Sequence, residues 1–246
     1  MFKIGDLVTR KSHLNDLIFK IENIIGNVAY LKGINVRLCA DSLLDDLMYA
    51  EEYNDDERFY NSINDIKKHE RNDYFYLPGK ILHIDGDKDY LNRCIEFYKK
   101  ANVLAFGVYS KETEICQNIE KYLNDINPDI VVITGHDSNI KQNSEHFCEA
   151  VRVCRRYQKD YDKLIIIAGA CQSNYEKLIK AGANFASSPK KINIHALDPA
   201  IIALSLSLTD KASNVDLLSL LEKTSNGKDG IGGVNTKGVM TTGYPR

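Results

Sequence analysis

The first 50 residues alternate apolar and polar positions in short runs, which is the pattern of half-buried β-strands. Turn signals at Gly5, Gly26-Asn27 and Gly33 separate the runs. Four or five strands in so short a segment predict a small SH3-like β-barrel over residues 1–50. The runs that carry this prediction are FKIGDLVTRKS, LIFKIENII, NVAYLKGI and VRLCADS.

Residues 78–246 have a different rhythm, in which near-continuous apolar runs alternate with amphipathic segments. Runs such as IVVIT and LIIIA suit central parallel strands that are buried on both faces. The alternation of strands and helices predicts an α/β domain with a doubly wound, mostly parallel sheet of the caspase-like or flavodoxin-like kind. The five predicted strands are ILHID, NVLAFGVYS, PDIVVITGHD, KLIIIAGAC and ANFASSP.

Two further segments complete the predicted organisation. Residues 51–77 are dense in charge and poor in aliphatic side chains, so they predict a charged linker or a solvated helix between the two domains. After Pro199 we expect one or two helices, and the glycine-rich stretch near the carboxyl terminus predicts a loop with a short hairpin.

The composition narrows the class of protein. With 32 basic and 34 acidic residues the formal net charge is -2, so neither nucleic acid nor an anionic membrane is an expected partner. No apolar run approaches the roughly 18–20 residues of a membrane span, and the amino terminus lacks a signal peptide, so we expect a cytoplasmic protein. No glycine-rich phosphate loop follows a strand and no Cys/His group has zinc spacing, so we expect no cofactor and no metal.

Polar side chains follow the predicted strands where ligands bind in open α/β sheets, beyond the carboxyl ends of the strands. Asp85 and Asp87 follow the first strand, His136 follows the third, and Cys171 follows the fourth. One edge of the sheet is therefore expected to bring together a thiol, an imidazole and several carboxylates.

Cys171 is the candidate nucleophile at this edge. It stands between a strand and a helix expected to begin near Ser173, and a helix amino terminus lowers the pKa of a nearby thiol. The small residues of AGAC predict an accessible sulfur. His136 is the candidate general base, while His195 and Asp198 form a competing pair that either supplies the base or orients the site.

Two readings without catalysis compete with an enzyme. The strand rhythm also resembles phosphoacceptor receiver modules, although no Asp stands at the tip of the third strand, which ends in Thr134-Gly135-His136. Alternatively, the chain is a scaffold that docks a partner through its amino-terminal barrel. A shared fold does not determine function, so the site residues have to decide.

The paired strand endings IVVITGHD and LIIIAGAC resemble peptidases of the caspase-like clan. In that clan one apolar strand ends in a catalytic His beside Gly, and the next ends in Ala-Cys. Here Gly135 precedes His136, whereas the clan has His-Gly, so the oxyanion donors differ. The backbone N–H of Cys171 is the first candidate donor, with Gly135 or Asp137 as alternatives.

A closer resemblance extends over nearly the whole chain. The runs AGACQSNYEKLIKAGANFASSPKKINIHALDP, VVITGHDS, LPGKILHIDGDKDYL and KIGDLVTRKS are similar to the YabG-type sporulation-specific peptidases. This resemblance implies a cysteine peptidase of the mother cell that acts on spore coat and cortex-associated proteins beside basic residues. By position it implies Cys171 as nucleophile and His136 as base.

A preference for basic residues requires an acidic group in the substrate pocket, because a carboxylate pairs bidentately with arginine. Asp85 and Asp87 are candidates, since caspase-like enzymes often carry specificity residues after the first strand. Asp137, Asp198 and the neighbouring His195 are alternatives, and Asp85-Gly86-Asp87 is otherwise a simple turn and helix cap. The basic pairs Arg155-Arg156 and Lys190-Lys191 are candidate sites of self-cleavage.

Overall fold

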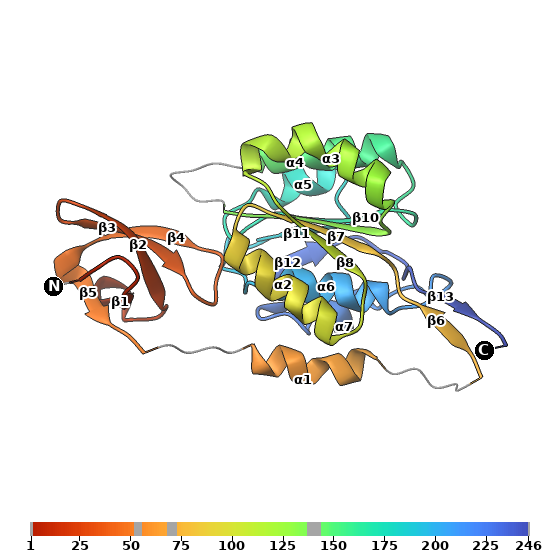
Figure 1. Cartoon of the computed structure of the whole chain (residues 1–246), viewed down its shortest axis with the longest axis horizontal. Coiled ribbons are helices and arrows are strands. Elements are labelled where there is room, and N and C mark those ends of the chain that lie inside the picture. Colours follow the sequence, from red (N-terminus) through yellow and green to blue (C-terminus); the bar gives the residue numbers. More distant parts are fainter. Residues whose placement is uncertain (1, 52–55, 68–72, 137–143, 246) are drawn as a thin grey trace.

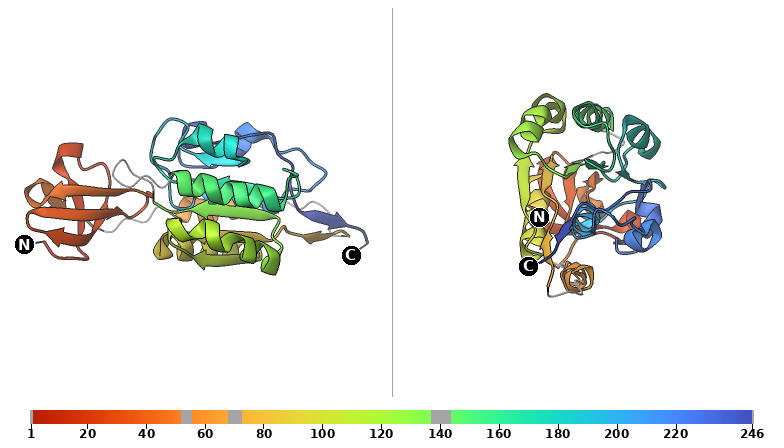
Figure 2. Two further views of the ribbon diagram at one scale, coloured as in Figure 1. Left: turned by 90° about the horizontal axis from the view of Figure 1, so that it is seen from above. Right: turned by 90° about the vertical axis from the view of Figure 1, so that its right-hand side faces the viewer.

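The computed structural model describes residues 2–51, 56–67, 73–136 and 144–245. Two separate sheets make up most of it, an antiparallel sheet at the amino-terminal end of the long axis and a mostly parallel sheet in the middle (Figures 1 and 2). A mixed α/β fold with these two kinds of sheet agrees with the prediction from the hydrophobic pattern.

The amino-terminal sheet has five strands in the order β4-β3-β2-β1-β5, and every neighbouring pair is antiparallel. Its alternating residues bury a small apolar cluster that includes Val8, Phe19, Ile21 and Leu31. Gly26, with φ of 60°, occupies the tight turn between the second and third strands. The strands are β1 (Leu7–Arg10), β2 (Phe19–Ile25), β3 (Val28–Gly33), β4 (Cys39–Leu43) and β5 (Leu47–Tyr49), with 3-10 helices at Lys11–His13 and Leu44–Asp46.

The central sheet has the order β12-β11-β10-β9-β7-β8, in which the first strand is antiparallel and the other five are parallel. All five apolar runs predicted as strands form this parallel part. The strands are β7 (Ile81–Asp85), β8 (Ala105–Tyr109), β9 (Ile130–Thr134), β10 (Ile165–Ala168), β11 (Phe185–Ser187) and β12 (Ile231–Gly233).

Helices cover both faces of the central sheet (Figure 1). Alternate strand residues face two separate apolar clusters: Val132 belongs to the cluster beneath α2 and α6, and Val131 to the cluster beneath α3, α4 and α5. The strands are therefore buried on both sides, as their continuous apolar runs predict. The helices are α2 (Lys88–Lys100), α3 (Glu112–Ile126), α4 (Ser144–Tyr157), α5 (Tyr175–Ala181), α6 (Asp198–Ser207), α7 (Leu217–Leu221) and α8 (Gly227–Gly230).

The charged segment between the sheets contains the helix α1 (Glu57–Ile66). One face of it is not solvated, because Phe59 and Ile63 are buried in the same cluster as α2 and α6. The prediction of a solvated helix or a linker is thus wrong for this face, where two apolar positions one turn apart are enough to dock the helix.

The glycine-rich tail does not form the hairpin that its turn residues predict. β12 pairs with β11, and β13 (Thr241–Gly243) pairs with β6 (Phe75–Leu77). Each tail strand thus satisfies its backbone groups against an edge strand elsewhere, an alternative that a local turn pattern does not reveal.

The antiparallel sheet lies against the carboxyl ends of the parallel strands. Lys32 Nζ is 2.7 Å from Asp87 Oδ2, and Val36 forms an antiparallel bridge with His195. The loop between β3 and β4 therefore enters the edge at which the sequence places the candidate site. None of the helices in the described part of the chain combines the length and apolar character needed to cross a bilayer.

Candidate functional site

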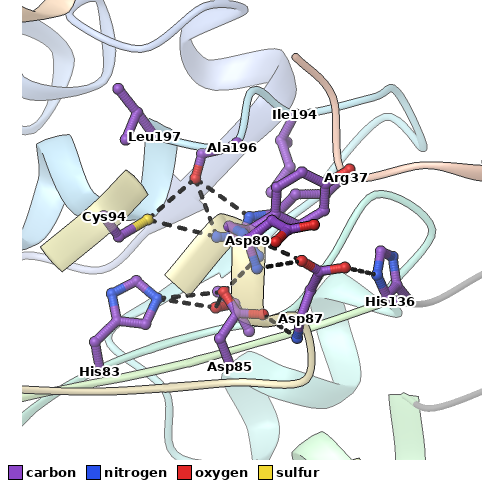
Figure 3. A network of polar contacts seen from close by, with 12 residues as sticks. Arg37, His83, Asp85, Asp87, Asp89, Cys94, His136, Ile194, Ala196 and Leu197 are labelled. Atoms are coloured by element: carbon purple, nitrogen blue, oxygen red, sulfur yellow. Dashed lines mark hydrogen bonds and ion pairs between the residues drawn. The ribbon is translucent and has the colours of Figure 1, made fainter. Parts of the chain in front are cut away.

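The centre of the candidate site is a buried ion pair between Asp85 and Arg37 (Figure 3). Asp85 ends β7, and both its side chain and that of Arg37 are fully buried. Arg37 Nη1 lies 2.7 Å from Asp85 Oδ2, and Thr134 Oγ1 donates to the same oxygen at 2.8 Å. Burial acts to raise the pKa of Asp85, but the Arg37 charge, His83 and the backbone N–H of Asp87 together lower that pKa to about 2.

Asp87 connects a helix terminus to His136. It is the N-cap of α2, accepting the backbone N–H of Asp89 at 2.9 Å and that of Tyr90 at 3.1 Å. Its other carboxylate oxygen lies 2.8 Å from His136 Nε2 and 2.7 Å from Lys32 Nζ. Although burial opposes the charge, these two partners hold the pKa of Asp87 well below its ordinary value. Asp87 is thus a cap, as the simpler reading predicts, and also an anchor for the imidazole.

His136 lies between this carboxylate and a thiol that the sequence did not single out. Its Nδ1 is 3.2 Å from the Sγ of Cys39, at the exposed start of β4. Burial acts to lower the pKa of His136, but the bonds to Asp87 and Cys39 together raise it to about 9. The imidazole is therefore cationic at neutral pH. The arrangement Cys39–His136–Asp87 has the geometry of a thiol, a base and an orienting carboxylate.

Cys171 occupies a closed position. It follows β10 in a turn, and its side chain is fully buried. Burial raises the pKa of its thiol to about 12, against the opposing effects of the Ile194 backbone and of Arg37. The prediction of an accessible sulfur with a lowered pKa is wrong in this structure, because the segments around Ile194 and Arg37 cover the thiol. The backbone N–H of Ile194 lies 3.3 Å from Cys171 Sγ.

His195 and Asp198 lie close together, but they do not form an imidazole–carboxylate pair. Asp198 accepts the backbone N–H groups of His195 and Ser225, each at 2.8 Å. The His195 ring lies 3.5 Å from an oxygen of Asp56 and packs against Phe59. Burial raises the pKa of Asp198 to about 6, although backbone N–H bonds oppose the shift. The pair therefore fixes the backbone beside Cys171.

Gly135 and His83 are both held by close contacts with neighbouring side chains. Gly135 packs so closely against Glu112 that an added Cβ would lie 2.8 Å from its Oε1, and the same oxygen accepts the N–H of His136 at 2.9 Å. His83 is buried, with its ring nitrogens 3.0 Å from the hydroxyls of Tyr98 and Thr134. Asp137 lies outside the described residues.

Three residues of the antiparallel sheet and its β3–β4 loop enter the site although the sequence did not predict them, namely Lys32, Arg37 and Cys39. They stand in ordinary strand and turn patterns, so neither periodicity nor motif distinguishes them. The one signal for Arg37 was chemical. A predicted acidic pocket would pair with an arginine, and an arginine of the same chain is one candidate. In the part of the chain that the structure describes, no group of three or more His, Cys, Asp or Glu residues is placed to hold a metal ion.

Comparison with known proteins assigns this sequence to a family. The model of the family described as "YabG peptidase U57" matches residues 3–68 and 55–245. The "Sporulation-specific protease YabG" of Bacillus subtilis (strain 168) is 38% identical over 287 aligned positions, which cover 99% of this chain and 98% of that protein.

A similar solved structure is described as an ABC transporter permease from the Pseudomonas fluorescens group. It covers 45% of this chain and 27% of its own, with 17% identity and a TM-score of 0.31, too low to support any inference. The family match and the full-length identity agree with each other, and they confirm the resemblance to the YabG-type peptidases over nearly the whole chain. The chain belongs to the YabG peptidase U57 family.

Proposed function

We propose that the chain is a cysteine endopeptidase that cleaves on the carboxyl side of basic residues, above all arginine. The observation that carries this proposal is the position of Arg37, whose guanidinium pairs with Asp85 while its backbone lies against the segment beside Cys171. An arginine whose backbone N–H pairs with the segment beside a thiol, and whose side chain lies on a buried carboxylate, is the arrangement that such a peptidase requires of its substrate.

In the proposed mechanism, Cys171 attacks the carbonyl carbon of the bound arginine itself, and His136 transfers the proton of the thiol to the leaving amine. Asp87 holds the imidazole ring of His136 in position for this transfer. The backbone N–H of His136 already donates to Glu112. We therefore assign the oxyanion to the backbone N–H of Cys171, with the backbone N–H of Gly135 as the second donor. Water then hydrolyses the acyl-enzyme.

The specificity residues follow from the same geometry. We assign Asp85 as the acidic base of the pocket and Asp87 as the residue that orients His136. His195 and Asp198 hold the segment 194–196 against the substrate backbone. The predicted contribution of Asp137 to substrate binding stays a prediction.

For the type of fold, the natural substrates and the place of action we propose more than the comparisons show. We propose a caspase-like arrangement over residues 78–246, an SH3-like barrel over residues 1–50, and residues 51–77 as their connection. The name of the Bacillus subtilis relative supports a role in sporulation. We propose spore coat and cortex-associated proteins as substrates, processed in the cytoplasm of the mother cell or at the coat.

Cys39 is a second candidate nucleophile, favoured by its exposure and its 3.2 Å contact with His136. Cys171 is preferred because it follows a central parallel strand and lies beside the segment that pairs with Arg37. The sequence also allowed a receiver-like or scaffold module without activity, and the experiment below addresses this alternative too.

The test compares Cys171→Ala with the matched variant Cys39→Ala on peptides that contain either Arg or Ala before the cut bond. We expect Cys171→Ala to lower kcat/KM by at least about 10³-fold, as loss of a nucleophile does. Cys39→Ala is expected to retain cleavage. The reverse result would assign the nucleophile to Cys39, and no cleavage by the folded wild-type chain would favour the module without activity.

A further inference from the structure

We propose that the loop between β3 and β4 is bound in the site as an internal substrate, and that the site cleaves the Arg37–Leu38 peptide bond of its own chain. This inference rests on the proposed peptidase function and identifies a substrate and a means of regulation for it. It accounts for three contacts that a simple connection between two strands does not need.

The first contact is made by the backbone of the loop. The N–H of Arg37 donates to the carbonyl of Ile194 at 3.2 Å, and the N–H of Ala196 donates to the carbonyl of Asn35 at 3.0 Å. Val36 between them forms an antiparallel bridge with His195. An extended peptide that adds as a strand beside a fixed segment is a common mode of peptide recognition. Residues 35–37 are therefore held as a substrate would be held.

The second contact is made by the side chain of Arg37. Its Nη1 pairs with Asp85 at 2.7 Å, its Nη2 donates to the carbonyl of Ala196 at 3.1 Å, and its guanidinium lies 4.9 Å from the centre of the Tyr90 ring. Burying an ion pair is costly, and apolar residues would join two sheets as well or better. A fully buried arginine at this point is better explained by a pocket that selects arginine.

The third contact concerns the chain that follows the bond. Cys39 stands two residues after Arg37, and its Sγ lies 3.2 Å from His136 Nδ1. The leaving side of the Arg37–Leu38 bond thus runs past the imidazole that would protonate it. On the other side of Arg37, the backbone N–H of Ile194 lies 3.3 Å from Cys171 Sγ, and the carbonyl of Ile194 accepts the N–H of Arg37. The stretch from Arg37 to Cys39 therefore connects the segment beside the Cys171 thiol with a residue that contacts the imidazole.

The groove continues beyond the loop. Cavities of about 270 and 250 Å³ lie on either side of it, and Asn35 lines both. The Tyr90 hydroxyl, 2.8 Å from the carbonyl of Val36, holds the loop between them. Both cavities adjoin the loop, so withdrawal of the loop would enlarge the space open to another polypeptide.

The reaction follows ordinary thiol chemistry. The Cys171 thiol gives its proton to His136 as its sulfur forms a bond to the carbonyl carbon of Arg37, the bond from that carbon to the Leu38 nitrogen breaks, and His136 passes the proton to that nitrogen. Water then attacks the thioester, which leaves a carboxylate on Arg37 and restores the thiol. One water molecule is consumed and no other reactant is needed.

Cleavage would not by itself separate the two products. Residues 1–37 keep β1, β2 and β3, while β4 and β5 remain with residues 38–246 and still pair with β3 and β1. The fragments are thus expected to stay associated until the protein is denatured. Cleavage frees the loop to leave the groove, which relieves the self-inhibition.

The basic pairs singled out in the sequence are less suitable cleavage sites. Arg155 lies within α4 and binds the carbonyls of Gly182 and Leu164, among others. Lys191 donates to the carbonyls of Gln172 and Ser173. Both side chains stabilise their own surroundings and neither has a carboxylate pocket like that of Arg37.

The experiment follows the chain by denaturing electrophoresis, intact mass and amino-terminal sequencing, with cleavage of an arginine peptide measured in parallel. We expect the wild type to yield residues 1–37 and 38–246 at a rate independent of protein concentration. Cys171→Ala is expected to remain intact, even when mixed with wild type. The matched control Arg156→Ala, at an exposed position on α4, is expected to be cleaved like wild type.

Arg37→Ala tests the inhibition. It is expected to remain intact and to cleave the peptide several-fold faster than uncleaved wild type, since its pocket is empty. Arg37→Lys keeps the buried charge and serves as the second variant if Arg37→Ala does not fold; it is expected to be cleaved more slowly. Peptide cleavage by a wild-type chain that never shows Leu38 as a new amino terminus would overturn this inference alone. A folded chain that cuts neither itself nor the peptide would overturn the proposed function and this inference together.

Discussion

The two sheets differ in how they are stabilised. The central sheet has an apolar cluster on each face, whereas the antiparallel sheet has a single small cluster around Phe19 and Ile21. The antiparallel sheet contacts the edge of the central sheet through Lys32, the buried Arg37 and backbone hydrogen bonds. The edge that carries the candidate site is therefore built on a sheet packed on both faces, while the element that covers it is held mainly by polar contacts.

The largest expected effect comes from removing the carboxylate at which the two sheets meet. Asp85→Ala should lower kcat/KM for arginine peptides by about 10³-fold, since breaking one partner of a buried ion pair costs about 3–5 kcal/mol. Unfolding in urea should show a loss of stability of similar size, because Arg37 is left buried without its counterion.

The control for this variant is Asp89→Ala, whose carboxylate is 69% exposed. It should change stability by less than about 1 kcal/mol, as exposed ion pairs do. Equal loss of cleavage by Asp85→Ala for arginine and alanine peptides would show that Asp85 is not the specificity residue.

The second prediction concerns the smaller apolar cluster. Phe19→Ala should destabilise the antiparallel sheet by about 3–5 kcal/mol, because a large buried side chain is replaced by a cavity. Hydrogen exchange should then increase for β1 to β5 while the amides of β9 and β10 stay protected. Tyr30→Ala, at a half-exposed position of the same sheet, is the matched control. Uniform loss of protection would show that the two sheets unfold as one unit.

The third prediction is a dependence on pH. The pKa of His136 is raised from 6.5 to about 9 in the folded chain, so its contribution is fully present below pH 6.5 and is lost as the pH rises through 9. The loss should be on the order of 2–3 kcal/mol. The pKa of Asp85 is lowered from 3.8 to about 2, so its contribution is present above pH 3.8 and is lost as the pH falls through 2.

Urea unfolding between pH 6 and pH 10 measures the alkaline part of this dependence. The decline should become smaller in His136→Gln. An unchanged decline in that variant would assign it to other groups and would weaken the view that the polar edge holds the two sheets together.

The smallest effect is expected from Lys32, whose Nζ lies 2.7 Å from Asp87 and 2.8 Å from Asp89. Lys32→Met should cost about 1 kcal/mol at low salt and less at high salt, because its ion pairs are only partly shielded from solvent. Lys20→Met, in a more exposed pair on β2, should have almost no effect. The two variants are compared by thermal unfolding at two salt concentrations.

Much of the fold could be predicted from the sequence because each parallel strand carries its own signal. IVVIT and LIIIA read as strands buried on both faces, and they are β9 and β10. The positions of Asp85 and Cys171 at strand ends follow from that rhythm. The tail strands could not be predicted, since β13 pairs with β6, more than 160 positions earlier in the chain.

Only part of the candidate site could be predicted from the sequence in the same way. The strand ends predicted Asp85, Asp87, His136 and Cys171 at one edge, but not that a second sheet would cover them. Arg37 reads as an ordinary member of a surface strand, and its burial depends on a hairpin docking against a segment more than 150 residues away. Such docking depends on shape and charge that come together only in the folded chain.

Three properties follow from the sequence without the structure: the alternation of strands and helices, the residue types at the strand ends and the resemblance to a peptidase family. These properties depend on local periodicity and on residue type, which each segment carries independently. Only the folded chain shows that Cys171 is buried, that His136 contacts Cys39, and that Arg37 pairs with Asp85. Those properties arise from contacts between distant segments, for which the free energy is shared among partners that no single stretch of sequence contains.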